Sequence, residues 1–261
     1  MISSTDNAKI KDIIKLKTKK RFRDEAGLFI SEGETSVMEI PVELIDEIFV
    51  SEDYKGSLPD ITGEPVQVSS KVFEKISDTV TPQGILVTVK KKETGSEEIL
   101  TAENNRPVLF LERLQDPGNL GTIVRMAEAA GVAGIIMSAD TADIYNPKTV
   151  RATMGSLYRV PFSYCRDFIE ELEKAKKAGI KVYATTPSDA KDLYECDYTK
   201  KSAFIIGNES AGVSDKAAEI ADERVKIPME GKVESLNAAV AAALISFEVR
   251  RQRTVSGGLI N

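Results

Sequence analysis

The residues whose types and spacing best suit chemistry lie at positions 115–131, in the stretch QDPGNLGTIVRMAEAAG. The apolar run VLFLERL precedes this stretch, and the order is typical of a buried strand, a glycine-rich turn and a helix. Backbone N–H groups at the start of a helix attract anions, so such a turn is a candidate binding site. Asn119 stands between two glycines, and Arg125 follows Gly121 by one helical turn. We therefore take Asn119 and Arg125 as candidate functional residues.

Two other segments also combine glycine with polar residues after an apolar run. They are IIGNESAG at 205–212 and IPMEGKVESLNAA at 227–239. Each follows or contains the end of a predicted strand, and ligands of open parallel sheets bind beyond the carboxyl ends of the strands. Taken singly, the residues also have structural explanations, because Asn208 suits a turn and Ser235 suits a helix N-cap. Arg125 is harder to explain in this way, since its neighbours Ile123, Val124 and Met126 are apolar.

Two common nucleotide-binding patterns do not fit these segments. A dinucleotide fingerprint requires G-x-G-x-x-G, whereas the chain has only Gly118-x-x-Gly121. A P-loop requires G-K-[ST], and Thr122 follows Gly121 without a lysine. These mismatches argue against a pyrophosphate ligand and against a nucleotide-dependent oxidoreductase.

The absence of histidine from all 261 residues restricts the chemistry further. It excludes Ser-His-Asp and Cys-His nucleophile systems and histidine-containing metal sites. The two cysteines, Cys165 and Cys196, cannot form a four-cysteine zinc site and suggest no disulfide framework. We expect no metal, and proton transfer must use another group or water.

The composition predicts a globular protein of the cytoplasm. No apolar run approaches the roughly 20 residues that span a bilayer, and the amino terminus lacks the apolar core of a signal peptide. The net charge of −6 argues weakly against a nucleic-acid partner. However, residues 1–25 contain eight lysines and arginines against four acids, a stripe that suits either phosphate binding or a solvated helix face.

The pattern of apolar runs predicts two α/β domains. Residues 1–95 alternate short strands with helices and form a small α/β unit. Residues 96–105 are polar, lack clear periodicity and are predicted to be a linker. Residues 106–261 alternate strands and helices more clearly, and their apolar strands predict a mostly parallel sheet covered on both faces.

The three segments together resemble the signature motifs of the SpoU/TrmH family of RNA ribose 2′-O-methyltransferases, within the SPOUT superfamily. N-x-G-x-x-x-R begins at Asn119, G-N-E-x-x-G begins at Gly207, and I-P-M-x-G…S-L-N begins at Ile227. The segment 142–162 is also similar to the family, so the resemblance covers about 106–253. The stretch DNAKIKDIIKLKTKKRFRDEAGLFISEGE more loosely resembles the family's amino-terminal α/β/α RNA-binding domain.

The resemblance implies a parallel-sheet SPOUT domain with a carboxyl-terminal trefoil knot that binds S-adenosylmethionine. It also implies a cofactor pocket at the ends of strands 180–186, 203–207 and 224–228. The residues that it assigns to the cofactor are Thr185, Gly207, Ile227, Met229, Ser235 and Leu236. Three of them, Ile227, Met229 and Leu236, can form the apolar walls that an adenine ring requires.

The implied reaction is methyl transfer to a ribose hydroxyl, which needs alignment and the loss of a proton but no metal. The residues that the resemblance assigns to catalysis are Asn119, Arg125, Glu209, Ser235 and Asn237. Arg125 acts either as a base with a strongly lowered pKa or as a phosphate ligand that lowers the pKa of the hydroxyl. We favour the second role, because a guanidinium resists deprotonation.

The resemblance also implies structured RNA as the substrate and a homodimer as the assembly. The amino-terminal domain type favours ribosomal RNA over transfer RNA as the methylated substrate. The residues predicted to bind RNA are Lys9, Lys17, Lys19, Lys20, Arg21 and Arg23. The alternatives are a transfer-RNA 2′-O-methyltransferase and a non-catalytic RNA-binding protein of the same fold, which need not bind S-adenosylmethionine.

Overall fold

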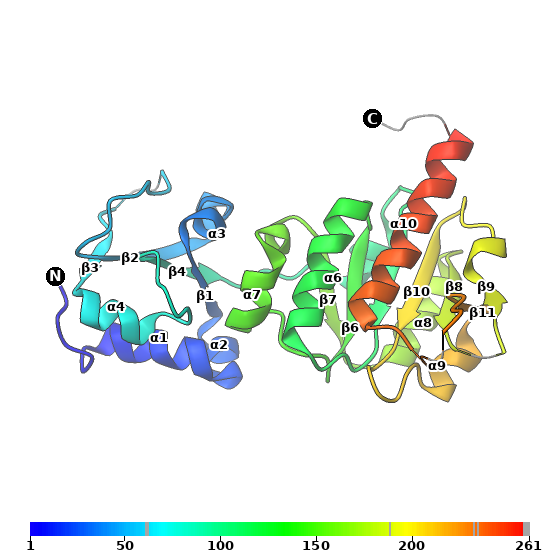
Figure 1. Ribbon diagram of the computed structural model, residues 1–261, viewed down its shortest axis with the longest axis horizontal. Helices are drawn as coiled ribbons and strands as arrows, with labels where there is room; N and C mark the ends of the chain where they lie inside the picture. The colour runs from blue at the N-terminus through cyan, green and yellow to red at the C-terminus, as the bar shows by residue number, and fades with distance from the viewer. Residues whose placement is uncertain (61–62, 188, 232, 234, 258–261) are drawn as a thin grey trace. The chain divides into compact units, whose positions relative to one another are not determined.

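The computed structural model describes residues 1–60, 63–187, 189–231, 233 and 235–257, and it contains two compact units (Figure 1). Unit 1 comprises Met1–Lys92 together with Asp143–Tyr158, and unit 2 comprises Glu93–Ala142 together with the chain from Arg159. The division differs from the predicted boundaries in two respects. The predicted linker 96–105 belongs to unit 2. The segment Asp143–Tyr158, which we placed in the second domain, packs as part of the first.

Unit 1 contains a four-stranded sheet with the order β1-β4-β2-β3. Its strands are β1 (Leu28–Glu32), β2 (Ile45–Ser51), β3 (Val66–Val68) and β4 (Ile85–Lys90). Strand β4 is antiparallel to both β1 and β2, whereas β2 and β3 are parallel. The helices of residues 1–92 are α1 (Ala8–Thr18), α2 (Lys20–Ala26), α3 (Glu34–Met38), η1 (Val42–Leu44) and α4 (Ser70–Ile76). Apolar residues of α1 and α4 pack on the sheet and form the core of the unit.

The segment Asp143–Tyr158 contributes α7 (Pro147–Thr153) and η2 (Ser156–Tyr158) to unit 1. The ring of Tyr145 lies 4.7 Å from that of Phe29 on β1, measured between centroids. The Tyr145 hydroxyl also donates to the carbonyl of Lys92 over 2.9 Å. These contacts are long-range in sequence, which explains why local pattern placed the segment elsewhere.

Unit 2 is built on a seven-stranded sheet with the order β7-β6-β5-β10-β8-β11-β9, and every pair of neighbours is parallel. The predicted parallel sheet is therefore confirmed. The strands are β5 (Val108–Leu111), β6 (Gly134–Ser138), β7 (Phe162–Cys165), β8 (Lys181–Thr185), β9 (Lys191–Asp192), β10 (Ser202–Ile206) and β11 (Glu223–Lys226). Every residue of β5, β6 and β10 is buried, as expected for central strands covered on both faces.

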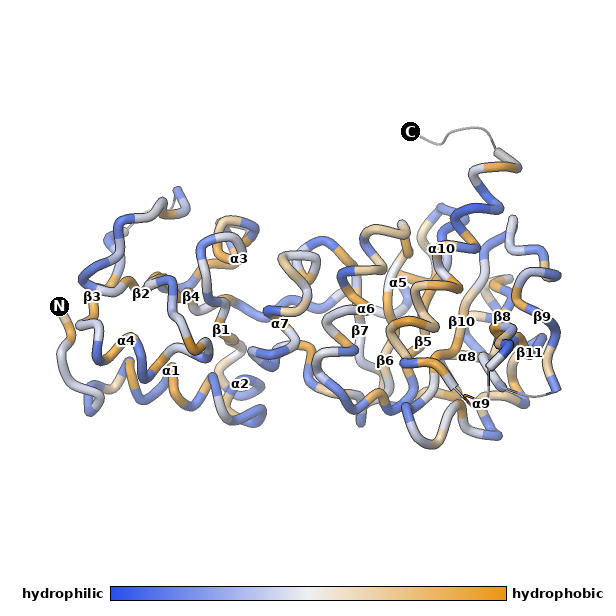
Figure 2. The backbone as a smooth tube through the Cα atoms, in the orientation of Figure 1, coloured by the Kyte–Doolittle hydropathy of each residue, from blue (hydrophilic) through white to orange (hydrophobic). Residues whose placement is uncertain are grey.

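Helices cover both faces of this sheet (Figure 1). Helices α6 (Pro117–Ala130) and α10 (Ala238–Gly257) pack side by side on one face. The helices on the other face are α5 (Ser96–Thr101), α8 (Phe168–Lys177) and α9 (Asp215–Ile220), and η3 (Leu193–Glu195) follows β9. Helix α5 lies in the predicted linker, where buried Ile99 and Leu100 join the core. Figure 2 shows the hydrophobic residues concentrated in the strands and in the first half of α10.

The direction in which the chain crosses the sheet reverses between β5 and β10. From β5 the chain passes through α6 to β6, whereas from β10 it passes through α9 to β11 on the other side. Ligands of open parallel sheets bind at such a switch point, beyond the carboxyl ends of the strands. The trefoil knot that the resemblance implies stays a prediction. Within the described ranges, no helix combines the length and hydrophobicity needed to cross a bilayer.

Candidate functional site

Three segments converge at the carboxyl edge of the unit 2 sheet: the β5–α6 loop, the β10–α9 loop and the chain leading into α10. The first two meet because β5 and β10 are hydrogen-bonded neighbours at the switch point. Their contact continues past the strands, since the Glu112 N–H donates to the carbonyl of Ile206 over 2.9 Å. Residues about ninety positions apart in sequence are thus adjacent in space.

The β10–α9 loop folds tightly on itself after Gly207. The backbones of Asn208 and Gly212 form an isolated bridge, and a Cβ added at Gly207 would lie 2.1 Å from the carbonyl carbon of Gly212. Only glycine therefore fits at position 207. The Asn208 side chain accepts from the N–H groups of Ser210 and Ala211, and its Nδ2 donates to the carbonyl of Arg113 over 2.8 Å. Asn208 thus connects the two loops, a role that sequence reasoning missed although its motif was recognised.

Three of the five predicted catalytic residues form a hydrogen-bonded chain. The Nδ2 of Asn237 donates to the Oδ1 of Asn119 over 2.9 Å, and the Nδ2 of Asn119 donates to the Oε1 of Glu209 over 3.1 Å. One residue comes from each converging segment. The chain therefore connects all three motifs through side chains alone.

Glu209 also holds the start of the β5–α6 loop. The backbone N–H groups of Gln115 and Asp116 donate to its two carboxylate oxygens over 3.3 and 3.4 Å. Burial raises the pKa of the Glu209 carboxyl, but the hydrogen bonds from Asn119, Gln115, Asp116 and its own backbone outweigh burial and hold that pKa below the ordinary value of 4.5. The carboxylate is therefore ionised at neutral pH and is a weak proton acceptor.

This arrangement predicts a pH-dependent loss of stability in the variant Glu209→Gln. A carboxyl group whose pKa is lower in the folded than in the unfolded protein stabilises the fold at pH values above its unfolded-state pKa. This stabilisation is lost as the pH falls through the folded-state pKa. At pH 7 the variant should be less stable by about 1 kcal/mol, a figure reduced for solvent exposure. The gap to the wild type should close as the pH falls below the ordinary glutamate value of 4.5, as measured by urea unfolding across pH. A gap that widens in acid would contradict the arrangement.

A pocket of about 360 Å³ adjoins this hydrogen-bonded chain, between the carboxyl edge of the sheet and α10. All six residues predicted to contact the cofactor line it: Thr185, Gly207, Ile227, Met229, Ser235 and Leu236. The further apolar lining that sequence reasoning missed includes Leu193, Ile206, Val213, Val225, Ala238, Ala241 and Ile245. Most of these residues are apolar side chains typical of a protein core, so no local sequence signal identifies them as pocket residues.

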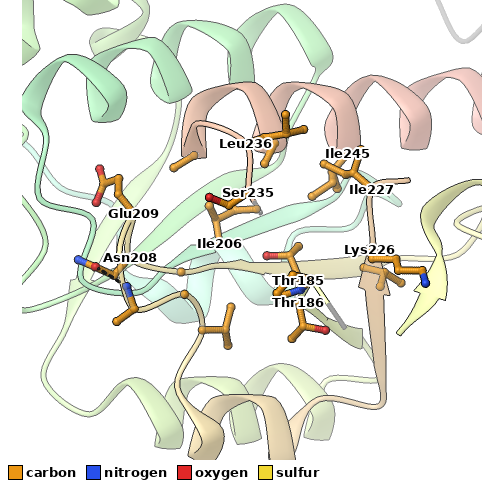
Figure 3. A pocket seen from close by; sticks show the side chains of 18 of the residues that line it. Thr185, Thr186, Ile206, Asn208, Glu209, Lys226, Ile227, Ser235, Leu236 and Ile245 are labelled. Carbon is orange, nitrogen blue, oxygen red and sulfur yellow. Dashed lines mark hydrogen bonds between the residues drawn. The ribbon is translucent and has the colours of Figure 1, made fainter. Parts of the chain in front are cut away.

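Charged groups stand at the two ends of the pocket. Figure 3 shows Glu209 at one end and Lys226 at the other, with Thr185 and Ile206 between them. Lys226 directly precedes the I-P-M segment and was also missed. Among the residues that the structure describes, no group of three or more acidic or cysteine side chains is placed to hold a metal ion.

The other two predicted catalytic residues, Ser235 and Arg125, lie outside this hydrogen-bonded chain. Ser235 lines the pocket, but Asn237 rather than Ser235 caps α10, because its Oδ1 accepts from the N–H groups of Ala239 and Val240. Arg125 lies on α6 with its side chain exposed and does not line the pocket. No hydrogen bond or ion pair to another described residue engages its guanidinium, which is open to solvent.

Comparison with known protein families gives a match for each of the two parts of the chain. Residues 106–247 match the model of the SpoU rRNA methylase family. The chain belongs to this family. Residues 7–87 match the MRM3-like substrate-binding domain. The chain is 36% identical to the 23S rRNA (guanosine(2553)-2′-O)-methyltransferase of Bacillus subtilis, over 95% of this chain and 98% of that protein.

Solved structures of SpoU-type methyltransferases agree with this assignment over nearly the whole chain. An S-adenosylmethionine-bound rRNA methyltransferase from Sinorhizobium meliloti superposes with a TM-score of 0.85 at 31% identity, covering 96% of this chain and 97% of that one. The Streptomyces viridochromogenes methyltransferase AviRb, in complex with the same cofactor, superposes with a TM-score of 0.83 at 29% identity, covering 96% and 99%. The present chain is thus an S-adenosylmethionine-dependent methyltransferase.

The pocket of this SpoU methyltransferase fits such a cofactor. Its volume lies within the range of small-molecule sites, and its walls are mostly apolar with a few polar groups, as an adenine ring requires. The ionised carboxylate of Glu209 and the ammonium of Lys226 can complement a ligand that carries charges of both signs.

The structure alters the predicted RNA-binding stripe of unit 1. Arg23 is only 3% exposed, and its guanidinium is paired with Asp143, so it offers no surface to RNA. Three other members form ion pairs at the surface, and Lys17 donates to the carbonyl of Ser77. The surface pairs are Lys9–Glu47, Lys20–Asp24 and Arg21–Glu25. The side chain of Lys19 is exposed and forms no hydrogen bond or ion pair with another described residue. Much of the apparent positive charge is therefore neutralised within the unit.

Proposed function

We propose that this SpoU methyltransferase methylates the 2′-oxygen of a ribose in ribosomal RNA, in the cytoplasm. The observation that carries the proposal is the Asn237–Asn119–Glu209 chain, which joins all three motifs beside the pocket at the switch point. The Bacillus subtilis relative, whose name specifies 23S rRNA, matches both units rather than the methylase part alone. This match supports ribosomal RNA over transfer RNA.

The proposed division of labour follows from the positions of the side chains. S-adenosylmethionine supplies an electrophilic methyl group when bound. Asn119 and Asn237 hold polar groups in fixed positions where a ribose must lie, since each is restrained by the hydrogen-bonded chain. Glu209 orients Asn119 and the β5–α6 loop, and its lowered pKa makes it a poor acceptor for the hydroxyl proton.

Arg125 is the proposed source of electrostatic assistance. Its exposed guanidinium can bind a phosphate next to the target ribose and stabilise negative charge as the 2′-hydroxyl is deprotonated. The chain has no histidine, and with Arg125 and Glu209 both poor bases the proposed proton acceptor is water. Ser235, which lines the pocket in the last part of the third motif, would fix the chain that leads into α10.

A methyl-transfer assay on deproteinised RNA tests the proposal. The protein is incubated with radiolabelled S-adenosylmethionine and, separately, with 23S rRNA, 16S rRNA and bulk transfer RNA from a strain that lacks the gene. We expect label in ribosomal RNA, retained in alkali-resistant dinucleotides, because a methylated 2′-oxygen cannot promote cleavage of the adjacent phosphodiester. Label in transfer RNA alone would show that the substrate is transfer RNA and not ribosomal RNA. RNA binding without transfer or cofactor binding would indicate a non-catalytic protein.

We further propose a homodimer formed through α10. Val240, Leu244 and Phe247 recur at helical spacing on this helix, and all three are exposed although they are large and apolar. A contiguous exposed apolar stripe on a soluble domain commonly marks an interface. Its place next to α6, which carries Asn119 and Arg125, would put the interface near the proposed site.

The variant Phe247→Glu tests the dimer. A charge placed at the centre of an apolar interface must be desolvated without a partner, so we expect weakening of self-association by at least about tenfold. Sedimentation velocity should then show monomers at micromolar concentration. Val42→Glu is a matched control, since Val42 is about as exposed but lies on η1 of unit 1. Equal dimerisation of both variants would rule out α10 as the interface.

A further inference from the structure

Arg113 has an unusual backbone conformation directly after β5. Its φ is +53°, in the left-handed region that side chains other than those of Gly, Asn and Asp seldom adopt. Three hydrogen bonds hold this conformation. Its N–H donates to the Ser138 hydroxyl over 2.9 Å, and its carbonyl accepts from the side chains of Asn208 and Gln115 over 2.8 and 3.1 Å. A glycine would adopt it without strain, so the fold alone does not explain an arginine.

The side chain of Arg113 is also incompletely satisfied within the chain. Its Nε is buried and has no hydrogen-bond partner, whereas the side chain as a whole is 40% exposed. The nearest acid is Glu112, whose Oε1 lies 3.7 Å from Nη2, too far for a hydrogen bond. The other oxygen of Glu112 already accepts from the Ser214 N–H over 2.8 Å. Glu112 and Arg113 thus form a loose ion pair without a hydrogen bond, which leaves the exposed part of the guanidinium able to bind a second group.

The location of Arg113 points to a ligand of the reaction. It lies at the switch point, bonded through its carbonyl to Asn208 of the second motif and two residues before Gln115, which binds Glu209. It does not line the cofactor pocket. Strained residues and unsatisfied polar groups that persist at such a position commonly serve function. Because Arg113 does not line the cofactor pocket, the substrate is the ligand of the reaction that it can bind.

We propose that Arg113 binds a backbone phosphate of the substrate RNA close to the methylated nucleotide, an inference that rests on the proposed function. A guanidinium matches the geometry of a phosphate through paired N–H donors, and an exposed one beside the site requires little rearrangement to do so. Arg113 would act in substrate binding, whereas Arg125 would act mainly in the chemical step. Arg113 would approach the RNA from the end of β5, and Arg125 from α6.

Arg113→Gly and Arg113→Asn test the proposal without threatening the fold, because both residues accept a positive φ. Arg113→Lys retains the charge. In methyl transfer to 23S rRNA we expect the glycine and asparagine variants to raise KM for RNA about tenfold with little change in kcat, and the lysine variant to recover part of the loss. The Kd for S-adenosylmethionine should not change. In filter binding, the slope of log K against log salt should shrink by about 0.7–0.9, as for one lost phosphate contact.

The outcomes separate the two proposals. An active wild type with an unchanged KM in Arg113→Gly would overturn the role of Arg113 alone. A raised KM with an unchanged salt slope would also overturn it, since the contact would then not be to phosphate. If the wild type transfers no methyl group, the proposed function fails, and filter binding still decides whether Arg113 contributes a phosphate contact.

Discussion

Replacing Arg125 with alanine should lower kcat for methyl transfer about a hundred- to a thousandfold, the usual cost of removing one preorganised charge that stabilises a transition state. The Kd for S-adenosylmethionine should remain the same, because Arg125 lies outside the pocket. Its side chain is exposed on α6, so stability should change by no more than about 0.5 kcal/mol. Single-turnover transfer of labelled methyl groups to 23S rRNA, with calorimetry for the cofactor, measures both effects.

Two further variants make the Arg125 result specific. Arg125→Lys keeps the charge but loses the paired donors, so it should retain intermediate activity. Arg106→Ala removes another exposed arginine of unit 2, just before β5 and at the opposite edge of the sheet, and should transfer methyl groups as the wild type does. If Arg125→Ala and Arg106→Ala had the same kcat, Arg125 would have no part in the mechanism.

Breaking the Arg23–Asp143 ion pair should destabilise unit 1 by about 3–5 kcal/mol, the range for removing one partner of a buried pair. Arg23 donates to the Oδ2 of Asp143 through Nε and Nη2, over 3.0 and 2.6 Å, and through Nη1 to the carbonyl of Leu16 over 2.7 Å. Asp143→Ala would leave a guanidinium buried without its countercharge. Urea unfolding of the full chain, followed by circular dichroism, should show this loss.

The control for this prediction is an exposed pair in the same unit. Arg21 and Glu25 form an i,i+4 pair on α2 with both side chains largely exposed, so Glu25→Ala should cost less than about 1 kcal/mol. The double variant Arg23→Met/Asp143→Leu removes both charges and should recover most of the stability, because no unpaired charge remains. Comparable losses in Glu25→Ala and Asp143→Ala would show that burial of the pair contributes little.

The sequence by itself determined the elements whose residues are locally patterned. Apolar runs such as 108–111 and 203–206 predicted buried strands, and their alternation with helices predicted a parallel sheet, because strands covered on both faces must be apolar throughout. The order of the three motifs identified the family, and all six predicted cofactor residues line one pocket. These features depend on residue type and local spacing, which a sequence displays directly.

Only the tertiary structure decided which polar groups meet. The same arginine type is buried against an acid at position 23, strained at the switch point at 113 and exposed at 125, and local pattern distinguished none of these states. The segment Asp143–Tyr158 joined unit 1 through partners more than fifty residues away. The energy of an ion pair or hydrogen bond depends on burial and on a partner's position, and both are set by packing between distant parts of the chain.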